Sequence, residues 1–443
     1  DQIHLHMKYI IIGAGPCGLA MAKALKDVGI SYDHVEADEI LGGNWAHGVY
    51  KTVYTDTCKD VMQYEGFPFP EDTPPFLSQA HMLEYLNQFA TAYDLHKKIR
   101  FGTKVVWVEA IENNLWRVHF QNQLSEIYKG VIVCNGHHWD KQFPNLPGSF
   151  SGELMHAKDY KEPRQLQDKK VLVIGSGNSA ADIVCESARV SKLSVLALND
   201  SPWIFPKTIM GIPLGRLKVK NYPNFITAIL VRLLLRISFG KHSYYNLEKP
   251  NHKPFEKHPT VSEELPYYLK HGRIMVKKGI NNVSDRVVTF ADDSSIDFDL
   301  VVAATGYKLS FPFLPPSLVR TENKNLLCIG HCVYPDYKGL FFMGWQQVRG
   351  GVGSLASAFS KAIVDLISIE EESGLPSGLV LQEMKNTLSV TNLYSSKELY
   401  QWTKKHNYKT LSKVAKKLRN RYDHLNLPTP EKMPDSNLVM QVF

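Results

Sequence analysis

The same local pattern, an apolar strand followed by a glycine-rich turn and a helix, occurs twice in this chain. Residues 8–12 form an apolar run that ends in Gly13-Ala14-Gly15-Pro16-Cys17-Gly18, after which apolar residues recur at helical spacing. Residues 170–174 end in Gly175-Ser176-Gly177-Asn178-Ser179-Ala180, and a second helical pattern follows. Such openings are typical of βαβ units that bind dinucleotides. The repeat predicts an α/β fold with two dinucleotide-binding, Rossmann-like domains.

The glycines of the first loop have separate physical tasks. Gly13 permits the tight turn, Gly15 lets a pyrophosphate approach the backbone, and Gly18 lets the helix pack closely on the strand. The N-terminus of the following helix offers free N–H groups to phosphates. The next strand ends at Glu36, whose carboxylate can accept hydrogen bonds from ribose hydroxyls. The predicted dinucleotide-binding residues here are Gly13, Gly15, Pro16, Cys17, Gly18 and Glu36.

The second loop follows the same motif with one substitution. Ala180 stands where a third glycine is usual, and it is acceptable because close packing needs only a small residue there. The predicted nicotinamide-nucleotide residues of this loop are Gly175, Gly177, Asn178 and Ser179. Two such loops on one chain normally mean that hydride passes between two dinucleotides, because a flavin accepts a nicotinamide hydride and delivers the electrons elsewhere.

The position of the second loop suggests how the domains are divided. We expect an FAD-binding domain made of residues 8–163 and 306–443, into which an NAD(P)H-binding domain of residues 164–305 is inserted. Residues 208–269 mix proline, aromatic and basic residues without Rossmann periodicity, so we expect an irregular insertion there. Its apolar stretch 225–239 contains two arginines and is too short to span a bilayer, which favours an amphipathic helix.

Charge and cysteine usage restrict the classes of partner. The net charge is +7, but the basic residues are spread along the chain, so we expect no nucleic-acid partner. One late cluster predicts a solvated helix face, with peripheral membrane contact as the alternative. The six cysteines lack the spacing of a disulfide framework or a zinc site, which predicts a cytoplasmic location and no metal. The cluster consists of Lys404, Lys405, Lys409, Lys413, Lys416, Lys417, Arg419 and Arg421.

Two further motifs point to one family. Residues 150–160 match the signature F-x-G-x-x-x-H-x-x-x-Y at every fixed position, and residues 304–307 match A-T-G-Y. On these motifs the chain resembles the class B flavoprotein monooxygenases, and more closely their flavin-containing monooxygenase branch, from about residue 8 to 369. Baeyer–Villiger relatives usually end the first motif in Trp, so Tyr160 favours the branch that oxygenates heteroatoms.

The resemblance implies an activity and further cofactor-binding residues. NADPH or NADH would reduce FAD, and molecular oxygen would form a flavin C4a-hydroperoxide that oxygenates a nitrogen or sulfur of a small molecule. His156 and Tyr160 would position the linker between the domains, and no catalytic triad or carboxylate pair is needed because the chemistry belongs to the cofactor. Additional cofactor-binding residues implied by the resemblance are Gly43, Asn44, Trp45, Thr305 and Gly306.

The chain departs from the family pattern at two places. Asp56 stands where the family commonly has an Asn that steadies the oxygenated flavin, which makes Asp56 the candidate catalytic residue, since an ionised Asp accepts but cannot donate a hydrogen bond. After the second strand of the nucleotide domain, family members often have an Arg for the 2′-phosphate of NADPH. This chain has Asn199 and Asp200, with Lys207 the nearest basic residue downstream.

These departures leave alternatives open. The first is Baeyer–Villiger oxygenation of a ketone, and the second is an uncoupled NAD(P)H oxidase or flavin-bearing redox sensor. A disulfide reductase would need a redox-active cysteine pair such as C-x-x-C, which the sequence lacks. The oligomeric state is open, with a dimer plausible.

Overall fold

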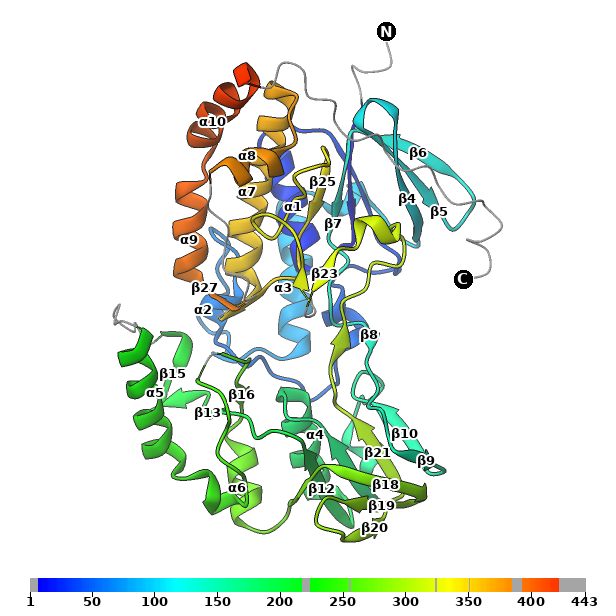
Figure 1. Cartoon of the computed structure of the whole chain (residues 1–443), viewed down its shortest axis with the longest axis vertical. Helices are drawn as coiled ribbons and strands as arrows, with labels where there is room; N and C mark the ends of the chain where they lie inside the picture. Colours follow the sequence, from blue (N-terminus) through cyan, green and yellow to red (C-terminus); the bar gives the residue numbers. More distant parts are fainter. Residues whose placement is uncertain are drawn as a thin grey trace.

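A five-stranded parallel sheet organises the half of the fold that contains α1 (Pro16–Asp27), α3 (Gln79–Ala92) and α7 (Val352–Ser373) (Figure 1). The structure, a computed structural model, describes residues 7–216, 224–254, 256–322, 325–349, 351–384 and 393–421. The strand order in this sheet is β25-β7-β1-β2-β3, so that β1 lies at the centre. The strands are β1 (Tyr9–Ile12), β2 (Tyr32–Val35), β3 (Ile99–Arg100), β7 (Gly130–Val133) and β25 (Leu340–Phe342).

A second parallel sheet repeats this arrangement. Its order is β10-β21-β11-β12-β17, with β11 at the centre. Because β25 rejoins the first sheet after β21 has completed the second, one unit is inserted into the other. The predicted α/β class with two Rossmann-like sheets is confirmed. The strands are β10 (Glu153–His156), β11 (Lys170–Ile174), β12 (Leu193–Leu198), β17 (Met275–Lys278) and β21 (Leu300–Ala303).

Each sheet is covered by helices on one face and by a small antiparallel sheet on the other. Every residue of β1, β7 and β21 is buried, as expected for parallel strands covered on both faces. In β11, Val171 and Val173 pack with the helices while Leu172 packs against the other layer, which is the two-residue alternation of a strand. The helices are α1 (Pro16–Asp27), α3 (Gln79–Ala92) and α7 (Val352–Ser373) on the first sheet, and α4 (Asn178–Val190) and α6 (Glu264–Lys270) on the second. The antiparallel strands are β4 (Val105–Ile111), β5 (Leu115–Phe120) and β6 (Ser125–Tyr128) on the first sheet, and β18 (Ile280–Asp285), β19 (Val287–Phe290) and β20 (Ser295–Asp297) on the second.

Two short strands connect the halves. β8 (Asp140–Lys141) pairs antiparallel with β22 (Tyr307–Lys308). The segment that leaves the first unit therefore lies beside the segment that returns to it. β9 (Gly148–Phe150) then pairs with β18, and β10 pairs with β21, although both precede residue 163. We therefore propose to place the first domain boundary near residue 147 in place of 163, and to keep the return at residue 306.

The insertion after β12 contains a helix of its own. β13 (Ile204–Phe205) pairs with β16 (Thr260–Val261), and β14 (Thr208–Ile209) forms a hairpin with β15 (Ile212–Pro213). The amphipathic helix predicted for residues 225–239 is confirmed as α5 (Asn224–Phe239). The late basic cluster falls on α9 (Ser396–Lys405) and α10 (Tyr408–Arg421), which are helical as predicted.

Helix α7 is apolar and long. Within the described ranges it alone has the length and composition of a membrane span, and 61% of its most apolar stretch is buried inside the fold. It packs against α1 beside the first sheet, where Leu355, Phe359 and Ile363 belong to the core. Core packing explains its hydropathy.

Candidate functional site

The first glycine loop lies where β1 and β7 part at the carboxyl edge of the first sheet. Gly13 has a φ of +106°, and a Cβ there would lie 2.5 Å from the carbonyl oxygen of Cys134, directly after β7. A Cβ on Gly18 would lie 1.9 Å from the carbonyl oxygen of Gly13. These close approaches leave no room for a side chain, because one would collide with backbone atoms. The loop thus sits at the switch point of the strand order, where such sheets bind ligands.

Residues 42–45 lie against this loop. The Gly42 N–H donates to the carbonyl of Ala14 at 3.0 Å. A Cβ on Gly43 would lie 3.1 Å from the Cα of Gly15, so the two glycines form a backbone cradle that side chains would fill. Asn44 and Trp45 begin the turn that follows, Asn44–Gly48. The structure therefore brings this element, singled out by resemblance, to the first loop.

Glu36 also meets the first loop. Its carboxylate accepts hydrogen bonds from the N–H groups of Ala14 at 2.6 Å and Asp38 at 3.0 Å. Pro16 and Cys17 open α1, which has no side-chain cap at its N-terminus. The uncapped turn, the glycine cradle and an acceptor at the end of β2 suit the diphosphate and ribose of FAD.

The second loop has the same relation to its sheet. Gly175 has a φ of +141°, and a Cβ there would lie 2.2 Å from the carbonyl oxygen of Ala304, directly after β21. Gly177 is different, since a Cβ there would meet nothing within 4 Å. Helix α4 starts at Asn178 and Ser179, again without a side-chain cap. A pocket opens beside the loop, and its lining residues are Gly175, Ser176, Gly177, Ala180, Ala181, Leu196, Leu198, Pro202, Leu247 and Leu265.

Asp56 lies at this second loop. The side-chain amide of Asn178 donates to the Asp56 carboxylate at 2.5 Å, and its oxygen accepts from the Val261 N–H at 2.8 Å. Burial raises the pKa of Asp56 to about 6, while the nearby Lys207 ammonium and the Asn178 amide oppose this shift. The structure thus joins Asp56 to the residue that opens α4.

The three residues expected around a 2′-phosphate are not all together. Asn199 and Asp200 are exposed directly after β12. Lys207 instead donates to the carbonyl of Thr55 at 3.3 Å, because β13 pairs with β16 and carries the chain toward residues 55–76. The cation near Asp200 is Lys257, whose Nζ lies 3.4 Å from the carboxylate.

Lys257 was not foreseen from the sequence. It lies within the insertion, together with Asn251, whose amide donates to Asp200 at 3.0 Å. Neither residue belongs to a motif, and the fold of the insertion alone brings them beside β12. No sequence signal could have identified them.

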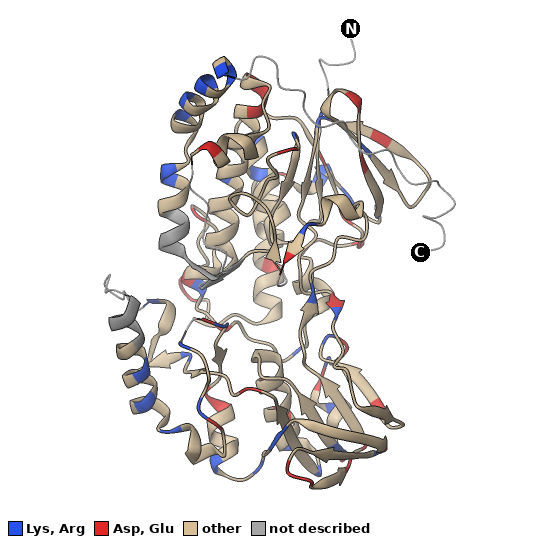
Figure 2. Cartoon of the chain, in the orientation of Figure 1, with Lys and Arg blue, Asp and Glu red and all other residues tan. Residues whose placement is uncertain are grey.

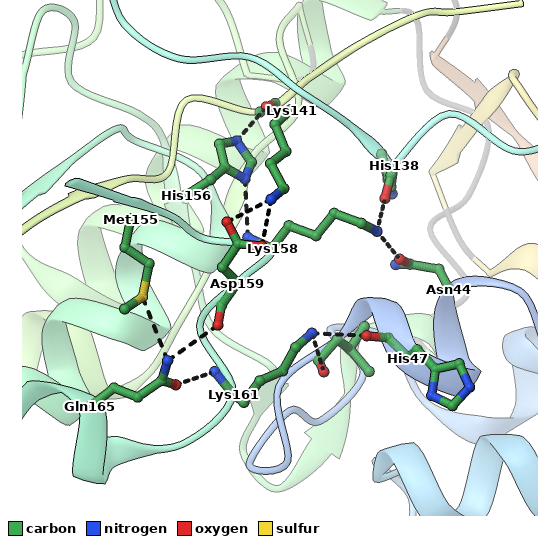
Figure 3. A network of polar contacts seen from close by, with 12 residues as sticks. Asn44, His47, His138, Lys141, Met155, His156, Lys158, Asp159, Lys161 and Gln165 are labelled. Atoms are coloured by element: carbon green, nitrogen blue, oxygen red, sulfur yellow. Dashed lines mark hydrogen bonds and ion pairs between the residues drawn. The ribbon is translucent and has the colours of Figure 1, made fainter. Parts of the chain in front are cut away.

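The linker network joins the two halves (Figure 3). The His156 Nδ1 accepts from the Lys158 N–H at 3.0 Å and its Nε2 lies 3.0 Å from the carbonyl of Gly306, to which it must donate. Burial lowers the pKa of His156, so this neutral tautomer is fixed and suits a positioning role. Lys158 reaches across to the carbonyl of His138 at 3.2 Å and to Asn44 at 3.4 Å. The Thr305 hydroxyl donates to the carbonyl of Gln142.

Comparison with protein families gives one match over most of the chain. A family model described as flavin-binding monooxygenase-like matches residues 6–427. Dimethylaniline monooxygenase 2 (N-oxide-forming) of Mus musculus is 31% identical over 359 residues, which is 74% of this chain and 67% of that protein. Flavin-containing monooxygenase 1 of Canis lupus familiaris is 33% identical over 342 residues, or 71% and 64%. The aligned part of the chain spans about two thirds of the length of these relatives.

Solved structures share the fold. The S-allyl-L-cysteine S-oxygenase of Allium sativum has a TM-score of 0.63 at 19% identity, covering 98% of this chain and 97% of that one. An open structure of cyclohexanone monooxygenase has a TM-score of 0.66 at 15% identity, covering 97% and 99%. OTEMO in complex with FAD and NADP has a TM-score of 0.66 at 19% identity, covering 83% and 85%.

Proposed function

Because the chain belongs to the flavin-binding monooxygenase-like family, we propose that it uses NAD(P)H and molecular oxygen to oxygenate a nitrogen or sulfur atom of a small molecule. FAD, when bound, supplies the redox chemistry by accepting hydride and reacting with oxygen. The observation that carries the proposal is the pair of glycine loops, each at the switch point of its own parallel sheet. Two dinucleotide sites on one chain are what hydride transfer between cofactors requires.

The protein residues hold and orient the cofactors in this proposal. At the first loop, the backbone N–H groups of the first turn of α1 would hold the FAD diphosphate, and Glu36, which accepts from the Ala14 N–H, would accept from the ribose hydroxyls. Gly43, Asn44 and Trp45, which lie against this loop, would contribute to the same site. At the second loop, the uncapped first turn of α4 would receive the diphosphate of the nicotinamide nucleotide.

The linker residues hold the two glycine loops in a fixed position relative to each other. The fixed tautomer of His156 ties β10 to Gly306, and the Thr305 hydroxyl ties the returning segment to Gln142. The Lys158 side chain reaches from this linker to Asn44, which belongs to the segment 42–45 beside the first loop. These contacts support a role of Thr305 and Gly306 in cofactor alignment, since movement of either segment would displace one dinucleotide relative to the other.

Heteroatom oxygenation is preferred over the Baeyer–Villiger reaction on two grounds. The signature ends in Tyr160, and the mouse relative is named for forming N-oxides. The structural neighbours include ketone-oxidising enzymes such as cyclohexanone monooxygenase, but at 15% identity that likeness concerns the fold. Tyr160 donates its hydroxyl to Glu186 on α4, so it takes part in the contact between the linker and the second unit.

Product analysis tests the proposal directly. Purified protein with bound flavin is supplied with NADPH or NADH, oxygen, and in turn dimethylaniline, a thioether and cyclohexanone. We expect N-oxide or sulfoxide in proportion to the nucleotide consumed. Ester formation from cyclohexanone without heteroatom products would favour the Baeyer–Villiger alternative. Nucleotide consumption with peroxide as the main product, for every substrate, would favour an oxidase or redox sensor.

Helix α5 suits contact with a membrane surface. Its side chains Ile229, Leu230, Leu233 and Ile237 are 45–75% exposed along one side, and Met210 on the neighbouring hairpin is 97% exposed. Residues 214–247 contain six Lys or Arg and no Asp or Glu. Figure 2 shows basic residues on α5 and on α9 and α10, which lie along the same edge of the molecule in this view. A cationic, apolar helix face of this kind binds at the interface of an anionic bilayer.

Contact between the α5 helices of two copies of this chain is less favourable than contact with an anionic membrane, because two cationic faces repel each other. We therefore propose a peripheral association with the cytoplasmic face of a membrane, which agrees with six free cysteines. Vesicles of phosphatidylcholine with phosphatidylserine should sediment the protein, and pure phosphatidylcholine should not. Leu233→Ser with Ile237→Ser should abolish sedimentation, while Leu124→Ser, at an exposed leucine beside β6, should not. Dimerisation that the α5 variant disrupts, without vesicle binding, would identify a protein interface instead.

A further inference from the structure

One face of α4 carries a row of polar side chains that packs against residues of two other segments. Asn178, Asp182 and Glu186 are spaced by four residues and therefore lie on one side of the helix. Asn178 donates to Asp56 at 2.5 Å, as described above. Asp182 accepts from the Tyr50 hydroxyl at 2.5 Å, and Glu186 accepts from the Tyr160 hydroxyl.

The row holds more negative than positive charge. The loop 50–60 contributes Tyr50 and Asp56, the linker contributes Tyr160, and α4 contributes Asp182 and Glu186. Among the described residues, Lys207 faces the row, and its charge acts on both Asp56 and Asp182. Among the described residues no group of His, Cys, Asp or Glu is arranged to hold a metal ion, so the charge is not balanced in that way.

Protons are therefore the natural counter-charge. Burial, assisted by the charge of Asp56, raises the pKa of Asp182 to about 7, against the hydrogen bond from Tyr50. Burial raises the pKa of Asp56 to about 6. Both carboxyl groups exchange protons near neutral pH, where a change in local charge alters their occupancy most.

The row begins at the second glycine loop. Asn178 is the first residue of α4, next to Gly177, and its amide touches Asp56 directly. A dinucleotide diphosphate bound to the N–H groups of this turn would add two negative charges beside Asp56. In partly buried surroundings such charges act over distances on the order of 10 Å and favour the protonated form of a carboxyl group.

We propose that binding of a nicotinamide dinucleotide at the second glycine loop draws a proton from solvent onto the carboxylate pair Asp56 and Asp182. This rests on the proposed function, which places the nucleotide at that loop. The step is an acid–base equilibrium, in which one O–H bond forms on a carboxylate and a buffer acid loses its proton. Its consequence is that nucleotide affinity falls as the pH rises through the range in which the pair loses its protons.

Isothermal titration calorimetry of the flavin-loaded protein measures this uptake. NADP+ is titrated at pH 7 in phosphate and in Tris buffer, and the dependence of the heat on the ionisation enthalpy of the buffer gives the number of protons exchanged. The 2′-phosphate of NADP+ titrates too, so the measured quantity is the difference between the wild type and Asp182→Asn. We expect the wild type to take up more, by about 0.3–1 proton per nucleotide.

Two further variants make the test specific. Asp297→Asn removes an exposed carboxylate paired with Lys170 and should leave the proton count unchanged. Lys207→Met keeps both carboxylates but removes their cation, so the pH of maximal uptake should move upward. It also serves if Asp182→Asn does not fold.

The outcomes separate the two proposals. Nucleotide binding with equal proton counts in the wild type and Asp182→Asn, and no pH shift in Lys207→Met, would overturn the proton uptake and leave the nucleotide site intact. No nucleotide binding by the flavin-loaded wild type would overturn both. An uptake that disappears in Asp182→Asn but persists in Asp297→Asn supports the inference.

Discussion

The two glycine loops share their geometry up to the first glycine and differ beyond it. Gly13 and Gly175 each turn the chain with positive φ against the backbone after the neighbouring strand. Beyond that point, Gly18 touches the carbonyl of Gly13, whereas the equivalent Ala180 has a side chain of its own. The first loop is also covered by Gly43, whereas a Cβ on Gly177 would face open space.

The residues around the two glycine loops also differ. Glu36 is bonded to the first loop itself, while Asp200 points to Lys257 and Asn251 of the insertion. Both helices bury mainly apolar residues, but α4 also buries Glu186 and carries the partly buried Asp182 on the same side. The first loop is thus closed, because Gly43 covers it, and the second is open at Gly177. A closed loop suits a cofactor that stays bound through many turnovers, and an open loop suits one that enters and leaves in each turnover. The comparison therefore supports the proposal that the flavin binds at the first loop and the nicotinamide nucleotide at the second.

The largest expected effect comes from the third position of each motif. Gly18→Ala would place a Cβ 1.9 Å from the carbonyl of Gly13, so α1 must move away from β1. We expect about 3 kcal/mol of lost stability, from overpacking against backbone that cannot yield. The reverse change at the second loop, Ala180→Gly, should cost only about 1 kcal/mol. Thermal unfolding of the two variants checks this, and equal losses would contradict the difference in packing.

Substitution of the second glycine of each motif should affect one cofactor and not the other. Gly15→Ala places a Cβ 3.6 Å from the Cα of Gly43, an ordinary contact, so the protein itself tolerates the change. Its Cβ intrudes only where the diphosphate meets the backbone, and we expect flavin affinity to fall about tenfold, or ~1.4 kcal/mol. Gly177→Ala should keep the flavin and raise the nicotinamide KM by about the same factor. Loss of flavin from Gly177→Ala would mean that the two sites are exchanged.

The charged row of α4 predicts a dependence of stability on pH that α1 cannot produce. Because the pKa of Asp182 is raised to about 7, the folded state holds its proton more tightly than the unfolded state. This contribution is complete below the unfolded pKa near 4 and is lost as the pH rises through about 7. We expect Asp182→Asn to be more stable than the wild type by about 1–2 kcal/mol at pH 8, and by much less at pH 4. A stability difference that does not change with pH in urea denaturation would contradict this.

The residues that the sequence predicts best are those whose role is local. The strand, turn and helix around Gly13 and around Gly175 follow from neighbours in the chain, and so does the amphipathic pattern of α5. The position of Lys207 could not be predicted, because it depends on the pairing of β13 with β16 across the insertion. Asp182 was missed although it lies four residues after Asn178, since its significance depends on Tyr50 from a distant segment.

The smallest effect concerns the choice of nicotinamide nucleotide at the open loop. We expect Asp200 to repel a 2′-phosphate and to accept from a 2′-hydroxyl, and the nearby Lys257 to offset part of the Asp200 charge. We therefore expect NADH and NADPH to be used with comparable kcat/KM. Lys257→Ala should raise the KM for NADPH about threefold and leave that for NADH unchanged, because the pair is exposed and worth only about 0.5–1 kcal/mol.

Three further changes sharpen this prediction. Asn199→Arg adds a bidentate phosphate ligand and should shift preference toward NADPH about tenfold. Lys170→Ala, at an exposed ion pair with Asp297, should leave the preference as it is. The threefold effect of Lys257→Ala should shrink as salt is raised, since surface charges are screened. The opposite result would be that Lys207→Ala abolishes the use of NADPH while Lys257→Ala has no effect. The 2′-phosphate would then bind beside Asp56 and not beside Asp200 at the end of β12, so the orientation expected for the nucleotide would be wrong.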